Sequence, residues 1–491
     1  MTDLAPDVLG WLVAHREGTA VERFARAHAR GVARYRELVP LERPAPGEQY
    51  AFDVDMDACT GCKSCVTACH TENGLDADET WRKVGLLHGG DARAPWQQPV
   101  TGSCHHCVDP ACLAGCPVLA YEKDPDTGIV FHLDDQCIGC RYCTLTCPYD
   151  VPQWSPKRGI VRKCDMCRSR LAGGDAPACV AACPNEAIRI RVVAHDAVIA
   201  DNEAGQFLPA APDPSITQPT TAYTTARAIP RNALPADYYD VHAEAAHAPL
   251  VVMLVLTQLA VGTFALAPFA ASGAGAMVAV ALGFVALGAS LFHLGRPHLA
   301  FRAVLGLRRS WLSREIVAFG GFAALASLAA LAPDRALVAA ASAAGALGVV
   351  ASTMVYAATR RATWRADVVG LKFLGTTIVL GLATLDAIGA HASWLPRALA
   401  IALGVKLAFE ASLLAHARDR HHGPWKRSAQ LQLGRLRALT CARFATGAGA
   451  IAFALCGVPE AAVALALAGE LCERALFFVA ACAPRMPGAL A

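Results

Sequence analysis

The distribution of apolar residues divides the chain into two unlike halves. From about residue 248 onward, the sequence is a series of Ala-, Leu-, Val- and Gly-rich runs separated by short segments that carry arginine. Each run has about 20 residues, the length that a helix needs to cross the hydrocarbon core of a bilayer. We therefore predict an all-α transmembrane bundle of about eight helices, at 248–269, 275–295, 315–332, 337–358, 368–388, 397–416, 441–458 and 461–481.

The first half lacks such runs and divides into three segments. Residues 1–49 include an amphipathic, arginine-bearing stretch with no uninterrupted apolar core of the secretory-signal type, so we predict an N-terminal helical extension. That extension either packs on its own domain or serves as a docking arm. Residues 196–247 are rich in Pro, Thr, Ala and Asp without a helical or strand period, which predicts an extended linker over a surface. The predicted domains are therefore 1–49, 50–195, 196–247 and 248–482.

Residues 50–195 hold sixteen of the twenty cysteines in four runs, CTGCKSCVTAC, CHHCVDPACLAGCP, CIGCRYCTLTCP, and CDMC followed by CVAACP. Three thiolates spaced two residues apart can bind three corners of one cubane, and the fourth cysteine, further along, binds the other cluster of a pair. The ligand candidates are Cys59, Cys62, Cys65, Cys69, Cys104, Cys107, Cys112, Cys116, Cys137, Cys140, Cys143, Cys147, Cys164, Cys167, Cys179 and Cys183.

Two other uses of clustered cysteines fit poorly. Cysteines this close in threes cannot form disulfides among themselves without strain. Zinc sites use Cys-x-x-Cys in twos rather than triplets with a distant fourth cysteine. Because every ligand position is cysteine, we predict four [4Fe–4S] clusters in an α+β, ferredoxin-like polyferredoxin domain. Four clusters in line indicate one-electron relay over distance. The remaining cysteines, in the second half, are predicted to be small apolar fillers.

The phrases CHHCVDPAC, DDQCIGCRYCTLTCPYDVPQ and GIVRKCDMC resemble the iron–sulfur subunits of complex molybdopterin oxidoreductases, especially dimethyl sulfoxide reductase and membrane-bound sulfite dehydrogenase. The resemblance implies that the first run pairs with the fourth and the second with the third. One departure is that His70, rather than proline, follows Cys69. The implied ligand sets are Cys59, Cys62, Cys65 and Cys183; Cys164, Cys167, Cys179 and Cys69; Cys104, Cys107, Cys112 and Cys147; and Cys137, Cys140, Cys143 and Cys116.

Arginine and lysine are unevenly shared between the two sides of the predicted bundle. The connections 296–314, 359–367 and 417–440 are rich in arginine and lie on the same side as the cysteine runs, whereas the opposite connections offer only Arg335 and Arg397. By the positive-inside rule, the iron–sulfur domain faces the cytoplasm. We therefore predict a multi-pass protein of the cytoplasmic membrane.

Two phrases at this edge of the membrane carry candidate quinone chemistry. FHLGRP ends the second predicted helix at His293, and SWLSREI begins the third at Glu315. Quinone turnover exchanges protons, which suits a histidine and a nearby carboxylate. From the residues alone, an interfacial histidine capping its helix is equally plausible. These phrases and LAGEL resemble the anchor subunit of the dimethyl sulfoxide reductase family, which implies that His293 and Glu315 act at the quinol site.

Other ionisable residues lie within the predicted helices. Lys406 and Glu410 fall in the sixth, and Glu470, Glu473 and Arg474 in the last. Such residues usually face a bundle interior, and pairing within the bundle is the favoured interpretation for Glu473 and Arg474. No haem is expected, because His293 and His416 are the only candidate axial pair and a poor one.

These features predict an electron-transfer and membrane-anchor subunit between the quinone pool and a molybdopterin catalytic subunit. The chain has no recognisable pterin site, so it is not predicted to act on substrate by itself, and no nucleic-acid partner is expected. WRKVGLLHGG, AYEKDPDTGIV and CPNEAIRI resemble sulfite-oxidising members, which favours sulfite oxidation to quinone in sulfur respiration. The alternatives are a quinol-oxidising subunit of a dimethyl sulfoxide-type reductase, a subunit of a hydrogenase or polysulfide reductase, and a plain membrane tether.

Overall fold

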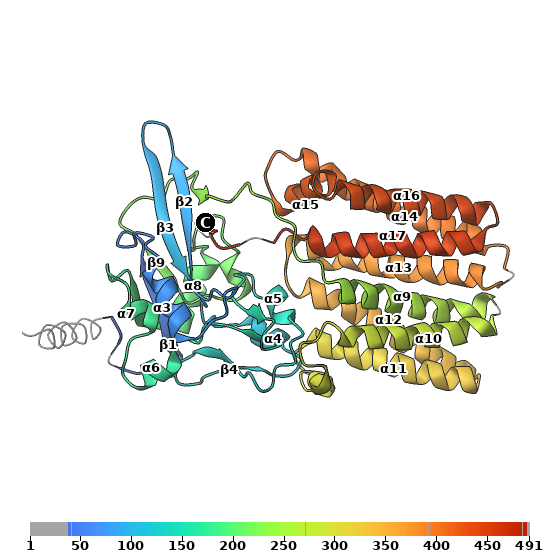
Figure 1. Cartoon of the computed structure of the whole chain (residues 1–491), viewed down its shortest axis with the longest axis horizontal. Helices are drawn as coiled ribbons and strands as arrows, with labels where there is room; N and C mark the ends of the chain where they lie inside the picture. Colours follow the sequence, from blue (N-terminus) through green and yellow to red (C-terminus); the bar gives the residue numbers. More distant parts are fainter. Residues whose placement is uncertain (1–37, 41, 271, 391, 484, 489–491) are drawn as a thin grey trace, which may run out of the picture.

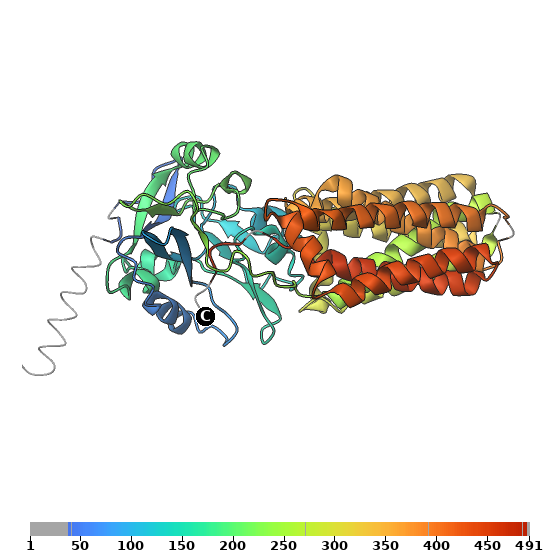
Figure 2. The same cartoon turned by 90° about the horizontal axis from the view of Figure 1, so that it is seen from above.

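The computed structural model describes residues 38–40, 42–270, 272–390, 392–483 and 485–488. It consists of an α+β part, here called the cysteine domain (residues 48–235), and a long helical part, the membrane bundle (residues 248–479). The two parts lie end to end (Figure 1), and the view from above shows the same arrangement (Figure 2). The predicted fold class is confirmed. Most of the predicted N-terminal extension lies outside the described residues, and strand β1 (Glu48–Asp55) begins at its end.

The cysteine domain is built on four small sheets. One has the order β8-β1-β9, a second the order β10-β2-β3, and two are hairpins, β4-β5 and β6-β7. β1 pairs antiparallel with β8 from Glu48 opposite Ala194 to Val54 opposite Ile188, and its alternate residues are buried. The other strands are β2 (Lys83–Gly90), β3 (Pro95–Gly102), β4 (Tyr121–Lys123), β5 (Val130–His132), β6 (Gln153–Ser155), β7 (Ile160–Arg162), β8 (Ile188–Ala194), β9 (Ala222–Thr224) and β10 (Leu234–Pro235).

Short helices lie within or beside the cysteine runs. Before three of them the backbone enters the left-handed region, at Lys63 (φ 61°), Arg141 (φ 59°) and Cys167 (φ 48°). Two of these turns lie between the second and third cysteines of a run, at Lys63 before Cys65 and at Arg141 before Cys143. The helices are α3 (Ser64–Glu72), α4 (Ala111–Gly115), α5 (Tyr142–Thr146), α6 (Arg168–Ala172) and α7 (Ala178–Ala181).

The segment predicted as an extended linker, 196–247, contains several short elements of regular structure. It contains most of helix α8 (His195–Glu203), and β9 pairs in parallel with β1 while β10 pairs with β2. Its polar composition gave no sign of these pairings, because short edge strands are recruited by the neighbouring backbone rather than by their own hydrophobic pattern. Only about the last dozen residues connect the cysteine domain to the bundle.

The membrane bundle contains eight long helices among the described residues. Seven of them are long and apolar enough to cross a membrane. The eighth, α17, has a similar length but carries Glu470, Glu473 and Arg474 in its second half. The long helices are α9 (Ala248–Leu266), α10 (Gly273–Leu291), α11 (Trp311–Leu331), α12 (Arg335–Ala357), α13 (Ala366–Ala387), α14 (Leu395–Leu414), α16 (Arg437–Leu455) and α17 (Pro459–Val479).

Close backbone packing holds the centre of this bundle together. A Cβ atom on Gly262 of α9 would lie 1.9 Å from the carbonyl oxygen of Thr377 on α13, and one on Gly381 would lie 2.5 Å from the Gly262 backbone. Small residues allow such an approach between membrane helices. Helix α15 (Pro424–Leu433), which was not predicted, lies at the end of the bundle that faces the cysteine domain (Figure 1).

Candidate functional site

The sixteen cysteines gather into four groups, each built from two of the runs. Cys59 has the sulfurs of Cys62, Cys65 and Cys183 as electrostatic neighbours, and corresponding sets surround Cys69, Cys107 and Cys143. The four groups are group 1 (Cys59, Cys62, Cys65, Cys183), group 2 (Cys69, Cys164, Cys167, Cys179), group 3 (Cys104, Cys107, Cys112, Cys147) and group 4 (Cys116, Cys137, Cys140, Cys143).

The groups follow one another from one end of the cysteine domain to the other. Groups 1 and 2 are neighbours through Cys65 and Cys179, and groups 2 and 3 through Cys164 and Cys104. Tyr121 lies beside cysteines of both group 3 and group 4. Group 4 shares its apolar surroundings with residues 294–303 of the membrane half. The order is therefore group 1, 2, 3, 4, with group 4 against the bundle.

Backbone amides point at the sulfurs in each type of loop. Gly139 N–H donates to Cys137 Sγ at 3.4 Å, and Met166 N–H donates to Cys164 Sγ at 3.4 Å. The residues that follow the Cys-Pro turns do the same, because Ala120 N–H lies 3.2 Å from Cys116 Sγ and Ala187 N–H lies 3.3 Å from Cys183 Sγ. Hydrogen bonds of this kind stabilise negative charge on sulfur, as a thiolate ligand requires.

The thiols of group 3 surround a space, and no group forms a disulfide. All twenty cysteines are free of disulfide bonds. Within the described residues, no three His, Cys, Asp or Glu side chains come close enough to hold a single metal ion. The four cysteines of group 3, however, line one cavity together. This geometry fits a polynuclear cluster, whose iron atoms occupy the corners of a cube, and not a mononuclear metal site.

Two buried cations lie among these sulfurs and were not identified from the sequence. Lys163 Nζ donates to Cys104 Sγ at 3.3 Å and to the Cys164 carbonyl at 2.7 Å, which places it between groups 2 and 3. Burial lowers the pKa of Lys163, but the charges of Cys104, Cys112 and Cys164 outweigh burial and raise it overall. Arg82 is 1% exposed and lies near sulfurs of groups 1 and 2. Neither Lys163 nor Arg82 is a ligand position of the cysteine runs, so the sequence pattern did not identify them.

Group 4 is joined to the membrane bundle by backbone contacts. Arg296 N–H donates to the Ile138 carbonyl at 3.0 Å, and Gly306 N–H donates to the Pro117 carbonyl at 2.7 Å. A Cβ atom on Gly295 would lie 2.0 Å from the Gly159 carbonyl oxygen, so only glycine fits there. FHLGRP and the segment after it therefore contact the cysteine loops directly.

Side chains of the arginine-rich connections reach the cysteine domain as well. Arg296 Nη1 donates to the Asp134 carbonyl at 2.8 Å, and Arg302 Nη1 donates to the Asp135 carbonyl at 3.0 Å. Arg361 Nε donates to the Leu145 carbonyl at 3.2 Å. The arginines that suggested the orientation of the protein thus also dock the two halves.

His293 lies at this junction, just beyond the end of α10. Its imidazole is hydrogen-bonded to the Ser290 backbone and lies near Arg141 of the group 4 loop, while Nδ1 has no partner among the described residues. Burial and the charges of Arg141 and His247 lower the pKa of His293 to about 4, although the hydrogen bond with the Ser290 backbone raises it. The ring is therefore neutral at neutral pH, with Nδ1 available to a ligand.

Glu315 lies on α11 and is 4% exposed. Its carboxylate is near the Ser352 hydroxyl and near Tyr142, which follows Arg141 in the group 4 loop. The Tyr142 hydroxyl donates to the Val355 carbonyl at 2.6 Å, so it reaches into the membrane half. No direct contact joins His293 to Glu315 among the described residues. Arg141 lies beside His293, and the next residue, Tyr142, lies beside Glu315. His293 and Glu315 are therefore both near group 4.

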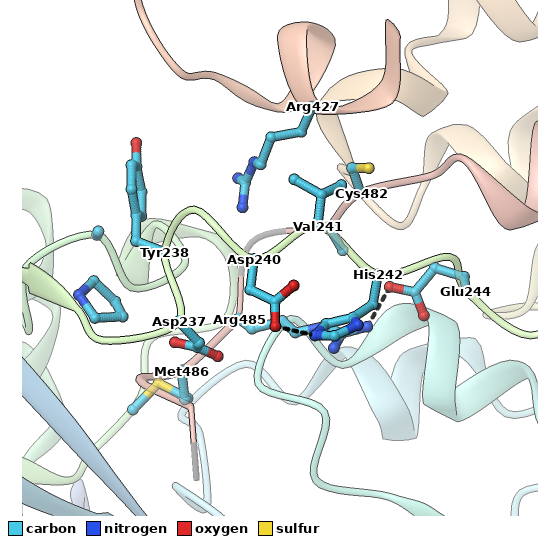
Figure 3. Close-up of a pocket in the computed structure, with 13 residues that line it drawn as sticks. Asp237, Tyr238, Asp240, Val241, His242, Glu244, Arg427, Cys482, Arg485 and Met486 are labelled. Carbon is cyan, nitrogen blue, oxygen red and sulfur yellow. Dashed lines mark hydrogen bonds and ion pairs between the residues drawn. The ribbon is translucent and has the colours of Figure 1, made fainter. Parts of the chain in front are cut away.

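A separate pocket lies where the connection to α9, helix α15 and the C-terminal segment meet (Figure 3). Its charged residues pair with one another: Arg485 donates to Glu244 at 2.6 Å, and His242 contacts Asp240 at 2.7 Å. None of the predicted site residues lines it. The pocket therefore marks a structural junction, and the cysteine groups with His293 and Glu315 remain the candidate site.

Comparisons with known proteins match the two halves separately. A family profile described as "4Fe-4S dicluster domain" matches residues 98–193, and one described as "DMSO reductase anchor subunit (DmsC)" matches residues 241–408.

Similar proteins match the cysteine domain. The B subunit of anaerobic dimethyl sulfoxide reductase from Haemophilus influenzae is 42% identical over 150 residues, which are 29% of this chain and 73% of that protein. The probable anaerobic dimethyl sulfoxide reductase subunit YnfG of Escherichia coli K12 is 43% identical over 148 residues, 28% of this chain and 72% of that protein. "Hydrogenase-2 operon protein HybA" of Escherichia coli O157:H7 is 34% identical over 171 residues, 30% of this chain and 52% of that protein.

Proposed function

Because the chain belongs to the dimethyl sulfoxide reductase family, as a fusion of a DmsB-like 4Fe–4S dicluster domain with a DmsC-type membrane anchor, we propose that it relays electrons between a molybdopterin catalytic subunit and the quinone pool. It is a multi-pass membrane protein and the electron-transfer and anchor subunit of a dimethyl sulfoxide reductase-type complex. The proposal extends this identity to the number of clusters, the quinone site, the orientation and the substrate.

Four [4Fe–4S] clusters are proposed, one in each cysteine group. The support is the membership of the groups, the amides directed at their sulfurs, and the cavity that group 3 lines. Each cluster would supply one-electron redox chemistry. The chain contributes the thiolates, the amide donors and, for every cysteine of the groups except Cys62, buried or half-buried surroundings.

The order of the groups supports a route for the relay, with the catalytic partner at one end and quinone at the other. Cys62 of group 1 is exposed, whereas group 4 is enclosed between the cysteine domain and the bundle. We place the catalytic partner at group 1 and the quinone beside group 4. Electrons then pass between the partner and quinone through all four groups.

His293 and Glu315 are proposed to bind quinone. The single observation that carries this assignment is that each lies beside the group 4 loop with a polar atom that has no partner among the described residues, Nδ1 of His293 and Oε1 of Glu315. A neutral imidazole can hydrogen-bond a quinone oxygen, and the carboxyl can exchange the proton that accompanies each electron.

Variants of these residues test the assignment. In the assembled complex, His293→Arg or Glu315→Gln should abolish quinone-linked turnover and leave dye-linked activity of the catalytic subunit intact. His298→Gln is a matched control, because His298 is an exposed histidine five residues further along the same connection. Loss of both activities in the His293 and Glu315 variants would instead assign these residues to assembly.

A ligand variant tests the number of clusters. The purified complex should contain about sixteen irons in this subunit if four [4Fe–4S] clusters are present. Cys59→Ser should remove or convert the group 1 cluster alone, leaving the spectroscopic signals of groups 3 and 4. Cys456→Ser is the control, since Cys456 is an exposed cysteine of the membrane bundle. About eight irons in the parent protein, or zinc in their place, would refute the assignment.

For the substrate, we propose sulfite oxidation on the cytoplasmic face, with electrons passing to quinone. The support is the resemblance of WRKVGLLHGG, AYEKDPDTGIV and CPNEAIRI to sulfite-oxidising proteins, together with the arginine-rich connections on the side of the cysteine domain. Reporter fusions in 359–367 should therefore behave as cytoplasmic. Deletion of the gene should make cells accumulate sulfite during oxidation of reduced sulfur compounds.

The second candidate is quinol oxidation for a sulfoxide reductase. The Haemophilus influenzae and Escherichia coli K12 relatives, which are named as dimethyl sulfoxide reductase subunits, favour it. In that case the deletion strain would oxidise sulfite normally and lose growth with a sulfoxide as terminal acceptor. The same strain thus decides between the two candidates.

A further inference from the structure

The membrane bundle buries a connected set of charged side chains, here called the bundle network. Arg443 forms two hydrogen bonds with Glu410, at 2.7 and 2.8 Å, and lies 3.1 Å from Glu470. Lys406 is paired with Glu470. The network joins helices α14, α16 and α17, and none of these four side chains is more than 9% exposed.

The bundle network continues toward the centre of the bundle through Thr376. The Thr376 hydroxyl donates to Glu470 at 2.6 Å and accepts from Arg474 at 3.1 Å. Arg474 also donates to Gln258 of the central helix α9 at 3.0 Å and lies 3.5 Å from Glu473. Glu473 contacts Lys372 at 2.9 Å. The side chain of Lys372 is 13% exposed, the largest exposure in the network.

Tyr356 lies between this network and Glu315. On α12 it is one helical turn from Ser352, whose hydroxyl is near the Glu315 carboxylate, and it packs on the same two rings as Arg474. The ring is held by Phe373 and Phe477, and Arg474 stacks on Phe373 with its guanidinium 3.8 Å from the ring centroid. A single phenol thus separates the proposed quinone site from the charged residues.

The charges are complementary across that phenol. When fully ionised, the bundle network carries four cations, on Lys372, Lys406, Arg443 and Arg474, and three carboxylates, on Glu410, Glu470 and Glu473. An ionised Glu315 supplies the fourth negative charge.

Several polar atoms along this line lack a hydrogen-bond partner among the described residues: Oε1 of Glu315, Oγ of Ser352, Nε2 of Gln258 and Nε of Arg474. Ser352, Gln258 and Arg474 are 0% exposed. Buried polar atoms are nearly always satisfied by protein or by ordered water. The line from Glu315 to Lys372 is therefore suited to water-mediated hydrogen bonding, the medium in which protons move.

The polar line opens toward one side of the membrane only. Every charged member lies within about 15 Å of the end of its helix that faces the cysteine domain, at 1.5 Å per residue. Beyond that depth, the charged residues of the long helices, as far as the structure describes them, are confined to the last turn at the opposite ends, as in Asp386 of α13 and Glu460 of α17. The intervening half of the bundle, as far as it is described, contains no charged residue, and its buried polar side chains are isolated hydroxyls such as Thr263 and Thr384.

We propose that the bundle network is a one-sided proton path between the quinone near Glu315 and water on the side of the cysteine domain. Reduction of one quinone takes two electrons from the cysteine groups and two protons from this path, forming quinol; oxidation of quinol reverses both flows. Glu473 and Glu315 accept and release protons, and Tyr356 and water join them. Turnover then moves no proton across the bilayer. This inference rests on the proposed quinone site.

The test uses the complete complex in lipid vesicles with its cysteine domain outward. Reduced viologen supplies electrons without protons, and pH dyes inside and outside follow proton uptake during quinone reduction. We expect uptake of two protons per quinone from the outside and none from the lumen. Uptake from the lumen would overturn the proposal.

Two variants locate the path. Tyr356→Phe keeps the aromatic contacts and removes one hydroxyl, and Glu473→Gln removes one carboxylate. Each should slow quinone reduction roughly 100-fold, the lower range for a positioned proton-transfer group, with quinone-analogue affinity and dye-linked substrate turnover unchanged. Asp386→Asn, at the opposite end of α13, should have no effect.

The outcomes separate this inference from the proposed function. A parent complex that binds no quinone analogue refutes the quinone site itself. A parent complex that binds the analogue, with both variants at full rate, overturns only the proton path. Equal loss of quinone-linked and dye-linked turnover in both variants would make the network structural and would likewise overturn it.

Discussion

The cysteine domain and the membrane bundle both bury cations, but they balance them differently. In the bundle, Arg443 and Lys406 face the carboxylates Glu410 and Glu470. In the cysteine domain, Lys163 and Arg82 have no carboxylate partner among the described residues, and their charged neighbours are cysteine sulfurs. The bundle therefore supplies carboxylates as countercharge, whereas Lys163 and Arg82 of the cysteine domain depend on sulfur; the buried Arg162 of that domain is paired with Glu79 at 2.7 Å.

This difference predicts that the stability of the cysteine domain depends on its clusters, whereas the stability of the bundle depends on its own ion pairs. Burying an unpaired charge costs several kcal/mol, and a site assembled from separate parts of the chain gains its binding free energy only when folded. The proposed clusters would thus be part of the folding of the cysteine domain. The bundle should fold without them.

Removal of iron should have the largest effect. Anaerobic chelation should unfold the cysteine domain and leave the bundle intact, because cluster loss strips the countercharge from Lys163 and Arg82. Hydrogen exchange followed by mass spectrometry would show β1 and β8 losing protection while α9 and α13 keep theirs. Equal protection of the cysteine domain before and after chelation would contradict the comparison.

Breaking one buried pair in the bundle comes next. Arg443→Leu removes both hydrogen bonds to Glu410 and leaves Lys406 as the one cation for Glu410 and Glu470 together, so it should destabilise the bundle by about 3–5 kcal/mol. Thermal unfolding in detergent would measure the loss, with cluster absorbance unchanged. The double variant Arg443→Leu with Glu410→Leu should recover part of the stability. The exposed pair Arg365–Asp367 provides the control, since its removal should cost less than about 1 kcal/mol.

The smallest effect is expected for Lys163→Met. The variant keeps the length of the side chain and removes the positive charge 3.3 Å from Cys104 Sγ. The reduced cluster, which carries more negative charge, loses that support, so the midpoint potential should fall by on the order of 60 mV, a tenfold change in a one-electron equilibrium. Redox titration monitored by electron paramagnetic resonance would detect it. Lys157→Met, at a highly exposed lysine, should leave every potential unchanged.

Features set by local spacing could be predicted from the sequence. The cysteine runs specify their own loops, and the apolar runs specify helices whose ends agree with the structure within a few residues, as in 368–388 against Ala366–Ala387. α17 is the instructive case: its length was predicted, but its charges remove it from the helices that are apolar enough to span by composition. Those charges are tolerated because α9, α13, α14 and α16 contribute partners.

Features that depend on distant parts of the chain could not be predicted. Lys163 acquires its role from Cys104, 59 residues away. Tyr142 bonds Val355, and the pairing of β9 with β1 joins positions about 170 residues apart. The excess of arginine on one side of the bundle also has two causes that the sequence could not separate. Arginine favours one side of the membrane, and Arg296, Arg302 and Arg361 also hydrogen-bond the cysteine domain.

The pairing of β9 and β10 with the sheets of the cysteine domain has a consequence for the fusion of the two halves. It leaves a tether of only about a dozen residues, Ala236 to His247, with a reach of roughly 40 Å. A tether this short raises the effective concentration of each half at the other to about the millimolar range. Individual docking bonds, such as Arg302 to Asp135, can therefore be weakened by mutation while the halves stay associated at fixed one-to-one stoichiometry.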